Sequence, residues 1–217
     1  MRSVLVVNPK GGSGKTTVAV NLASGLAARG DEVYLWDLDR QQSSQTWLGM
    51  RPAHVPLVHG LDTREQGARP DFGKASWLII DSPAGFHGKN LSHAVKLAAK
   101  ILVPIQPSVF DMAATSAFLQ VLREEKAVRK SRAFVGIVGV RVDPRTKAAA
   151  TLEAYLEQFD LPILGFLRDS QVYPNAAFNG LSVFDLPRYL AERDLEQWGP
   201  VLAWVTGEDP LPGVSLS

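Results

Sequence analysis

Residues 8–17 read Asn8-Pro9-Lys10-Gly11-Gly12-Ser13-Gly14-Lys15-Thr16-Thr17, and they directly follow the apolar run Val4-Leu5-Val6-Val7. Glycines let backbone N–H groups approach phosphate oxygens, while a lysine supplies positive charge and a hydroxyl can ligate Mg²⁺. This motif requires a strand before it and a helix after it. The apolar run is typical of a short strand, and apolar residues recur at helical spacing at Val18, Leu22 and Leu26. The stretch therefore predicts a phosphate-binding loop for a nucleoside triphosphate.

The residues of this loop have distinct predicted roles. Lys15 is expected to reach the β- and γ-phosphates and Thr16 to place its hydroxyl on Mg²⁺, while the N-terminus of the following helix faces the anion. The loop departs from the strict pattern, because Pro9 stands where a glycine is usual, and it carries an additional lysine, Lys10. The nucleotide-binding residues are expected to be Gly11, Gly12, Ser13, Gly14, Lys15, Thr16 and Thr17.

Two further apolar runs end in carboxylates. Residues 33–36 read as a buried strand followed by Asp37 and Asp39, and residues 77–80 as another followed by Asp81. Carboxylates at strand ends beside a phosphate loop are placed to ligate Mg²⁺ and to orient the attacking water. Because alternate residues on a strand face opposite ways, only one of Asp37 and Asp39 can point directly at the phosphates. Each of the three could instead cap a helix or a turn.

Three segments together, residues 10–17, 37–41 and 78–85, resemble the ParA/MinD family of deviant Walker A ATPases. The resemblance extends from the N-terminus to about residue 190. It is closest to the small ParA-type partition ATPases (ParF-like), which lack an N-terminal DNA-binding domain. Nothing like a helix-turn-helix precedes the loop here, so site-specific operator binding is not expected.

The resemblance implies a role for each charged residue near the loop. Lys10 would be the signature lysine, which crosses a dimer interface to the ATP of the partner. Asp39 would help to position the attacking water, and Asp81 would be the Walker B carboxylate, which holds Mg²⁺ through water. A cation offered in trans neutralises charge that develops in the transition state, and it makes the interface depend on the bound nucleotide. The implied catalytic residues are Lys10, Lys15 and Asp39, and the implied metal site comprises Thr16, Asp39 and Asp81.

Two later segments also resemble the family. Residues 102–111 are similar to the segment after its fifth strand, and Asp111 is expected to cap the next helix. Residues 139–143 fall where relatives place a strand end near the adenine. Arg141 is therefore expected either beside the adenine or in an ordinary salt bridge.

Composition limits the class of protein. The chain has 217 residues, enough for one α/β domain over 1–217, with a flexible tail expected from about residue 207. It contains no cysteine, which excludes disulfides, thiolate zinc sites and iron–sulfur clusters. Iron proteins of the nitrogenase type and metal-chaperone ATPases are therefore poor fits. No apolar run approaches the roughly 18 residues of a membrane span, and the N-terminus reads as a strand, so a cytoplasmic protein is expected.

Alternation of strand and helix predicts an α/β fold. We expect a single-domain, mostly parallel twisted sheet with helices on both faces and the ligand at the carboxyl ends of the strands. Residues 62–74, rich in glycine and charge, are expected to be a surface loop. Helices are expected at residues such as 113–129 and 148–159. Strands are expected at residues 2–7, 33–38, 55–58, 76–81, 100–105, 134–140 and 161–166.

The net charge of +1 is too small to indicate a nucleic-acid partner, but basic residues gather between positions 123 and 147. They could track a DNA backbone without reading bases, or they could be a solvated face. They are Arg123, Lys126, Arg129, Lys130, Arg132, Arg141, Arg145 and Lys147.

The apolar segment at residues 195–205 differs from the membrane helix of MinD. A MinD-like tail is amphipathic and basic, whereas this segment contains Glu196, a Gly-Pro pair and no lysine. We therefore expect no membrane partner, and we expect Trp198 and Trp204 to pack on the domain.

Together the residues and the resemblance predict an ATP-dependent partitioning or positioning ATPase with ATP and Mg²⁺ as its cofactors. It is expected to form an ATP-dependent homodimer, to hold nucleoid DNA non-specifically, and to be released when an adaptor, centromere-binding or cargo-linked protein stimulates slow hydrolysis. The cargo could be a plasmid, a chromosome, or a protein assembly such as a carboxysome or chemoreceptor cluster. Two alternatives stay open: a MinD-like membrane-surface regulator, and a metabolic ATP-dependent ligase or kinase on the same fold.

Overall fold

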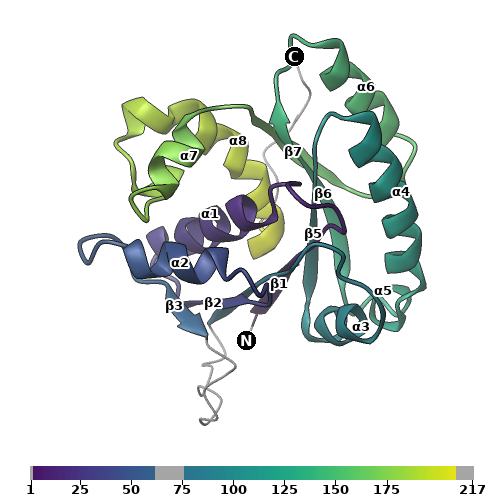
Figure 1. The fold of residues 1–217 in the computed structure, drawn as a ribbon, viewed down its shortest axis with the longest axis horizontal. Helices are drawn as coiled ribbons and strands as arrows, with labels where there is room; N and C mark the ends of the chain where they lie inside the picture. The colour runs from purple at the N-terminus through teal and green to yellow at the C-terminus, as the bar shows by residue number, and fades with distance from the viewer. Residues whose placement is uncertain (1, 62–75, 209–217) are drawn as a thin grey trace.

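The fold is built on one parallel sheet, described over residues 2–61 and 76–208 of a computed structural model (Figure 1). The sheet has seven strands in the order β3-β2-β4-β1-β5-β6-β7, and each described strand pair is parallel. The strands are β1 (Arg2–Val6), β2 (Val33–Asp37), β3 (His59–Leu61), β4 (Trp77–Asp81), β5 (Lys100–Ile105), β6 (Phe134–Val142) and β7 (Ile163–Arg168).

Helices cover both faces of this sheet (Figure 1). Helices α1, α2, α7 and α8 lie on one side, and α3, α4, α5 and α6 lie on the other. The helices are α1 (Lys15–Ala28), α2 (Ser43–Met50), α3 (Gly88–Leu97), α4 (Val109–Glu124), α5 (Lys126–Arg129), α6 (Lys147–Leu156), α7 (Val172–Ala177) and α8 (Arg188–Thr206), with a 3₁₀ turn η1 (Val183–Asp185) before α8.

The centre of the sheet determines where the phosphate loop lies. Strand β1 pairs with β4 on one side and β5 on the other, so its side chains are buried on both faces. Val4 and Val6 enter the core beneath α1, whereas Leu5 and Val7 enter the core beneath α3 and α4. In an open parallel sheet, ligands bind at the carboxyl ends of the strands where the strand order reverses. Residues 8–14 leave β1 at that position.

The predicted fold class is confirmed, with two corrections to its elements. Residues 55–58 are not a strand, because Pro52 and Pro56 lack backbone donors and the Val55 N–H closes a turn on the Pro52 carbonyl at 3.3 Å; β3 starts after them. The helix predicted at 113–129 starts earlier, at Val109, and is interrupted at Glu125, whose ψ of 131° is extended. The loop predicted at 62–74 and nearly all of the predicted tail lie outside the described residues.

Helix α8 packs along the sheet rather than standing apart from it. Trp198 is fully buried and donates its indole N–H to the Tyr173 hydroxyl at 3.2 Å, and Trp204 packs against the same core. The predicted packing of both tryptophans on the domain is confirmed. Within the described residues, no helix has the length and apolar character needed to cross a bilayer.

Candidate functional site

The phosphate loop runs from the end of β1 into the first turn of α1. Gly12 and Gly14 have φ angles of 76° and 84°, in the left-handed region where a Cβ is strained. Gly14 is the N-cap of α1 and provides no side-chain cap, so the first backbone N–H groups of the helix are left for another acceptor. These N–H groups and the positive end of the helix dipole together suit an anion such as a phosphate.

Lys15 lies inside this loop. Its ammonium donates to the Lys10 carbonyl at 2.8 Å and to the Ser13 hydroxyl at 3.3 Å, and its side chain is buried. Burial lowers the pKa of Lys15, and the negative charges of Asp81 and Asp39 act against that shift. The lysine is therefore held in the cradle by neutral acceptors, beside the two carboxylates that the sequence predicted to be its neighbours.

Asp37 and Asp39 have different surroundings, which separates their roles. One oxygen of Asp37 accepts from the Ser44 N–H at 2.9 Å and the Ser44 hydroxyl at 2.7 Å, and the other accepts from the Asp39 N–H at 2.8 Å. Asp37 therefore caps the start of α2 and braces the loop that carries Asp39. Asp39 is only half-buried, and one of its oxygens accepts from the Gln41 N–H at 3.0 Å. Of the pair, Asp39 is the carboxylate with an oxygen left for a ligand.

Asp81 is a buried carboxylate with an unused oxygen. It ends β4, is 1% exposed, and its Oδ1 has no hydrogen-bond partner in the described part of the chain. Burial raises the pKa of Asp81 from 3.8 to about 7; the Thr16 hydroxyl opposes the shift, and the nearby charge of Asp37 reinforces it. A buried polar atom without a partner is unfavourable in a folded protein unless a ligand satisfies it. Asp81 is therefore suited to a cation.

The donor set fits a magnesium ion held together with a nucleotide. No group of three or more His, Cys, Asp or Glu side chains among residues 2–61 and 76–208 could form an all-protein metal site. Mg²⁺ instead keeps several waters and takes one or two carboxylates plus phosphate oxygens. The Thr16 hydroxyl hydrogen-bonds the Asp81 carboxylate, whose Oδ1 is left without a partner, so the two side chains together could provide that kind of partial coordination.

Without Mg²⁺ and nucleotide, Asp81→Asn is expected to stabilise the chain at pH 8 and to change little at pH 4. The folded-state pKa of Asp81 is about 7, above its unfolded value near 3.8, so the unfolded chain releases this proton first. Wild-type stability therefore falls as pH rises from about 4 to about 7, by an amount on the order of 2–4 kcal/mol, and an amide avoids that loss. Urea unfolding with EDTA at pH 4, 6 and 8 measures the difference. A stability difference that is independent of pH would contradict a raised pKa of the buried Asp81 carboxyl.

Lys10 and Asp111 form an ion pair at the outer edge of the loop. The Lys10 Nζ lies 2.6 Å from Asp111 Oδ2, and the carboxylate side chain is 7% exposed. The expectation that Asp111 caps α4 is wrong: Ser108 is the N-cap, and its hydroxyl accepts from the Asp111 N–H at 3.4 Å. Because a serine three residues earlier takes that role, the Asp111 carboxylate is available to Lys10. No local sequence signal indicated this contact.

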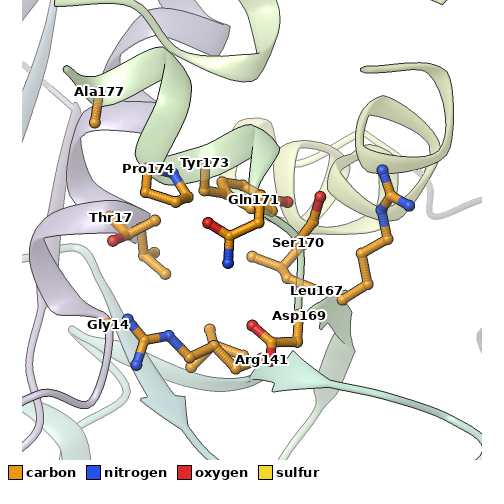
Figure 2. A pocket seen from close by; sticks show the side chains of 13 residues that line it. Gly14, Thr17, Arg141, Leu167, Asp169, Ser170, Gln171, Tyr173, Pro174 and Ala177 are labelled. Atoms are coloured by element: carbon orange, nitrogen blue, oxygen red, sulfur yellow. The ribbon is translucent and has the colours of Figure 1, made fainter. Parts of the chain in front are cut away.

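A cavity of about 350 Å³ opens beside the phosphate loop, at the carboxyl ends of β6 and β7 (Figure 2). Arg141 lines it and has a φ of 54°. Figure 2 shows the Gln171 amide pointing into the cavity between Arg141 and Thr17. Val18, Leu167 and Pro174 add apolar surface. Such a volume, with apolar surface and a few polar groups, suits a nucleoside next to the phosphate cradle.

Sequence reasoning missed most of this cavity. Asp169, Gln171 and Tyr173 follow β7 and line the cavity, but of its lining residues only Gly14, Thr17 and Arg141 were assigned to the nucleotide from the sequence. A signal was present, because the residues after any strand of a parallel sheet lie at its ligand-binding edge. It pointed to every strand end equally and did not select β7.

Comparison with known proteins shows the family to which this chain belongs. A sequence profile described as "CobQ/CobB/MinD/ParA nucleotide binding domain" matches residues 4–183. The "Maintenance of carboxysome distribution protein A" of Gloeobacter kilaueensis is 31% identical over 186 residues, which cover 84% of this chain and 83% of that protein. The "Chromosome-partitioning ATPase Soj" of Thermus thermophilus is 30% identical over 189 residues, covering 72% and 76%. In a solved ATP complex of an aspartate-to-alanine variant of Cyanothece McdA, the fold matches with a TM-score of 0.73 at 18% identity, over 98% of this chain and 99% of that one. The chain therefore belongs to the CobQ/CobB/MinD/ParA family of nucleotide-binding domains.

Proposed function

We propose that this chain is a MgATP-dependent positioning or partitioning ATPase that works as an ATP-bridged sandwich dimer. The observation that carries the proposal is the different placement of the two lysines of the loop. Lys15 is buried within the cradle, whereas the Lys10 side chain is 34% exposed at its rim and its ammonium pairs with Asp111 in the first turn of α4. A lysine at the rim of the site, not needed by its own loop, is placed to serve a nucleotide on a second subunit.

In this proposal the residues of the site divide the chemistry of hydrolysis. The loop N–H groups and Lys15 bind the phosphates, and Thr16 and Asp81 hold Mg²⁺, which would neutralise charge on the phosphate oxygens. Asp39 orients the attacking water, and Lys10 stabilises the transition-state charge on the partner's nucleotide. The cavity beside β7 holds the nucleoside. ADP and phosphate are the products.

We infer the kind of cargo from the names of similar proteins. Two proteins that match most of this chain are named for carboxysome distribution and for chromosome partitioning. We propose that this chain likewise positions a large cargo, a protein assembly or a DNA molecule, through a partner protein that stimulates hydrolysis. The proposed cycle ends when hydrolysis separates the dimer.

The basic run of residues 123–147 does not form one face. Strand β6 (nine residues, about 30 Å long) separates its members, because Arg132 precedes the strand and Arg141 lies near its end. Arg145 pairs with Asp143 at 2.9 Å, whereas the residues before the strand are exposed around α5, next to α3. We propose this larger group as the non-specific DNA surface: Arg123, Lys126, Arg129, Lys130 and Arg132.

Lys10→Ala is expected to abolish ATP-dependent dimerisation while leaving nucleotide binding within a few fold of wild type, since Lys10 lies outside its own cradle. Sedimentation velocity with ATP, ADP and no nucleotide, repeated with non-specific duplex DNA, measures both assembly and DNA association. Wild type should dimerise and bind DNA only with ATP.

A wild-type chain that stays monomeric with ATP and ignores DNA would overturn the proposal. Rapid turnover of a small-molecule acceptor without DNA or a stimulating protein would instead favour the metabolic alternative. Binding to lipid vesicles with ATP would favour the membrane alternative, against which stands the burial of Trp198 in α8.

A further inference from the structure

A buried carboxylate joins helix α8 to the wall of the cavity beside the phosphate loop. Asp194 of α8 is fully buried, and its two oxygens accept from the Arg168 Nε at 2.9 Å and the Arg168 Nη2 at 2.8 Å. Arg168 ends β7 and lines the cavity, whereas Asp194 is not among its described lining residues. A two-point contact between a guanidinium and a carboxylate fixes direction as well as distance. Asp194 therefore sets the position of the Arg168 side chain from outside the cavity.

The same carboxylate also holds Tyr173 of α7. The Tyr173 hydroxyl hydrogen-bonds Asp194, and it accepts from the Trp198 indole N–H at 3.2 Å. Burial and the negative charge of Asp194 raise the pKa of the Tyr173 hydroxyl, so the hydroxyl stays protonated and is the donor to the carboxylate. Tyr173 lines the cavity as well (Figure 2). One buried carboxylate thus holds two side chains of the cavity wall.

A backbone contact adds to these two side-chain contacts. The Arg168 N–H donates to Gln197 Oε1 at 2.9 Å, so α8 also holds the main chain at the end of β7. Residues 169–171 lie between the contacts at Arg168 and Tyr173, and all three line the cavity. The wall formed by residues 168–173 is therefore attached to α8 at both of its ends.

We propose that Asp194 is a positioning residue for the nucleoside, which holds residues 168–173 as a preformed wall of the cavity. The inference rests on the proposed placement of the nucleoside in this cavity and deepens it. Ordering a segment or its side chains on binding costs free energy, so a wall that is fixed beforehand binds its ligand more tightly. Asp194 thus contributes to nucleoside affinity without touching the nucleoside.

The proposed effect is confined to the nucleoside half of the nucleotide. The phosphates are assigned to the loop N–H groups and Lys15, which belong to the segment between β1 and α1 and have no described hydrogen bond to Asp194. Inorganic triphosphate carries the phosphates without the nucleoside. The ratio of the affinities for ATP and for inorganic triphosphate therefore isolates the contribution of the cavity, whereas general damage to the fold weakens both.

Asp194→Asn keeps the shape of the side chain but removes its charge. We expect it to lower the affinity for ATP about tenfold, while the affinity for inorganic triphosphate stays within about twofold of wild type. Isothermal titration calorimetry with Mg²⁺ and each ligand measures both affinities. Asp185→Asn is the matched control, because it breaks another buried two-point pair, with Arg51 at 2.9 Å, and neither residue is described as lining the cavity. The control should leave the ratio unchanged.

Tyr173→Phe covers the case in which Asp194→Asn does not fold. It keeps the ring that lines the cavity and removes only the hydroxyl that Asp194 holds, so we expect a loss of about threefold in ATP affinity and none for inorganic triphosphate. In the Asp194→Asn background the same change should have little further effect, because the contact is already lost.

The outcomes separate this inference from the proposed function. A ratio that stays at the wild-type value in Asp194→Asn or Tyr173→Phe, or that falls equally in Asp185→Asn, would overturn the positioning role and leave the proposed function intact. Wild type that binds inorganic triphosphate as tightly as ATP would show that the cavity contributes nothing to affinity. That result would overturn both the inference and the proposed placement of the nucleoside.

Discussion

Lys15→Ala is expected to remove nucleotide binding, lowering the affinity for ATP by about a hundredfold or more, the size expected when a buried charge-assisted contact to phosphate is lost. The Lys15 ammonium is buried in the loop, and among residues 2–61 and 76–208 its hydrogen-bond partners are the Lys10 carbonyl and the Ser13 hydroxyl. Both are weak acceptors compared with a triphosphate. A phosphate entering the cradle would therefore capture this lysine without breaking an ion pair.

Isothermal titration calorimetry with ATP and Mg²⁺ measures the loss. Lys10→Ala is the matched control, because it removes a lysine from the same loop but from outside the cradle. The control should bind ATP within a few fold of wild type. Equal loss of affinity in both variants would show that the two lysines share the nucleotide of one subunit, contrary to the proposed division of their roles.

Asp39→Ala is expected to reduce the rate of hydrolysis by about 10²- to 10⁴-fold while the ATP dimer persists. This is the effect expected when a group that orients or activates the attacking water is lost. Asp39 is half-buried near Lys15 and has no cation partner among its described hydrogen bonds. The carboxylate therefore contributes little to nucleotide affinity.

Asp37→Ala provides the contrast. Asp37 braces the Asp39 loop and the start of α2 through contacts at 2.7–2.9 Å, so its loss should lower stability by about 1–3 kcal/mol. Single-turnover hydrolysis and urea unfolding on both variants separate chemistry from folding. Slow hydrolysis in a stable Asp37→Ala, with normal hydrolysis in Asp39→Ala, would reverse the two assignments.

The parts of the site that could be predicted are those encoded in short stretches. Gly12 and Gly14 were recognisable because the motif needs backbone angles that other residues rarely adopt, and both have positive φ. Asp81 was recognisable because it directly ends an apolar run. The parallel sheet followed from the alternation of strand and helix, and its carboxyl edge gathers these residues, as expected.

The parts that could not be predicted depend on contacts between distant residues. Lys10 and Asp111 are 101 positions apart, and nothing near Asp111 distinguishes it from a helix cap. Asp37 and Asp39 look alike along the chain, and their roles are separated by contacts such as that of Asp37 with Ser44. The basic residues are close together along the chain, yet β6 places them at its two opposite ends.

The sequence by itself determined the phosphate loop and the carboxylates at the strand ends, because local backbone geometry and the order of strands and helices suffice for both. Only the packed structure shows which carboxylate braces the loop, which residues line the cavity beside the loop and where the Lys10 side chain lies. These assignments depend on which side chains the packed sheet brings within hydrogen-bond distance, and that distance is not a function of separation along the chain.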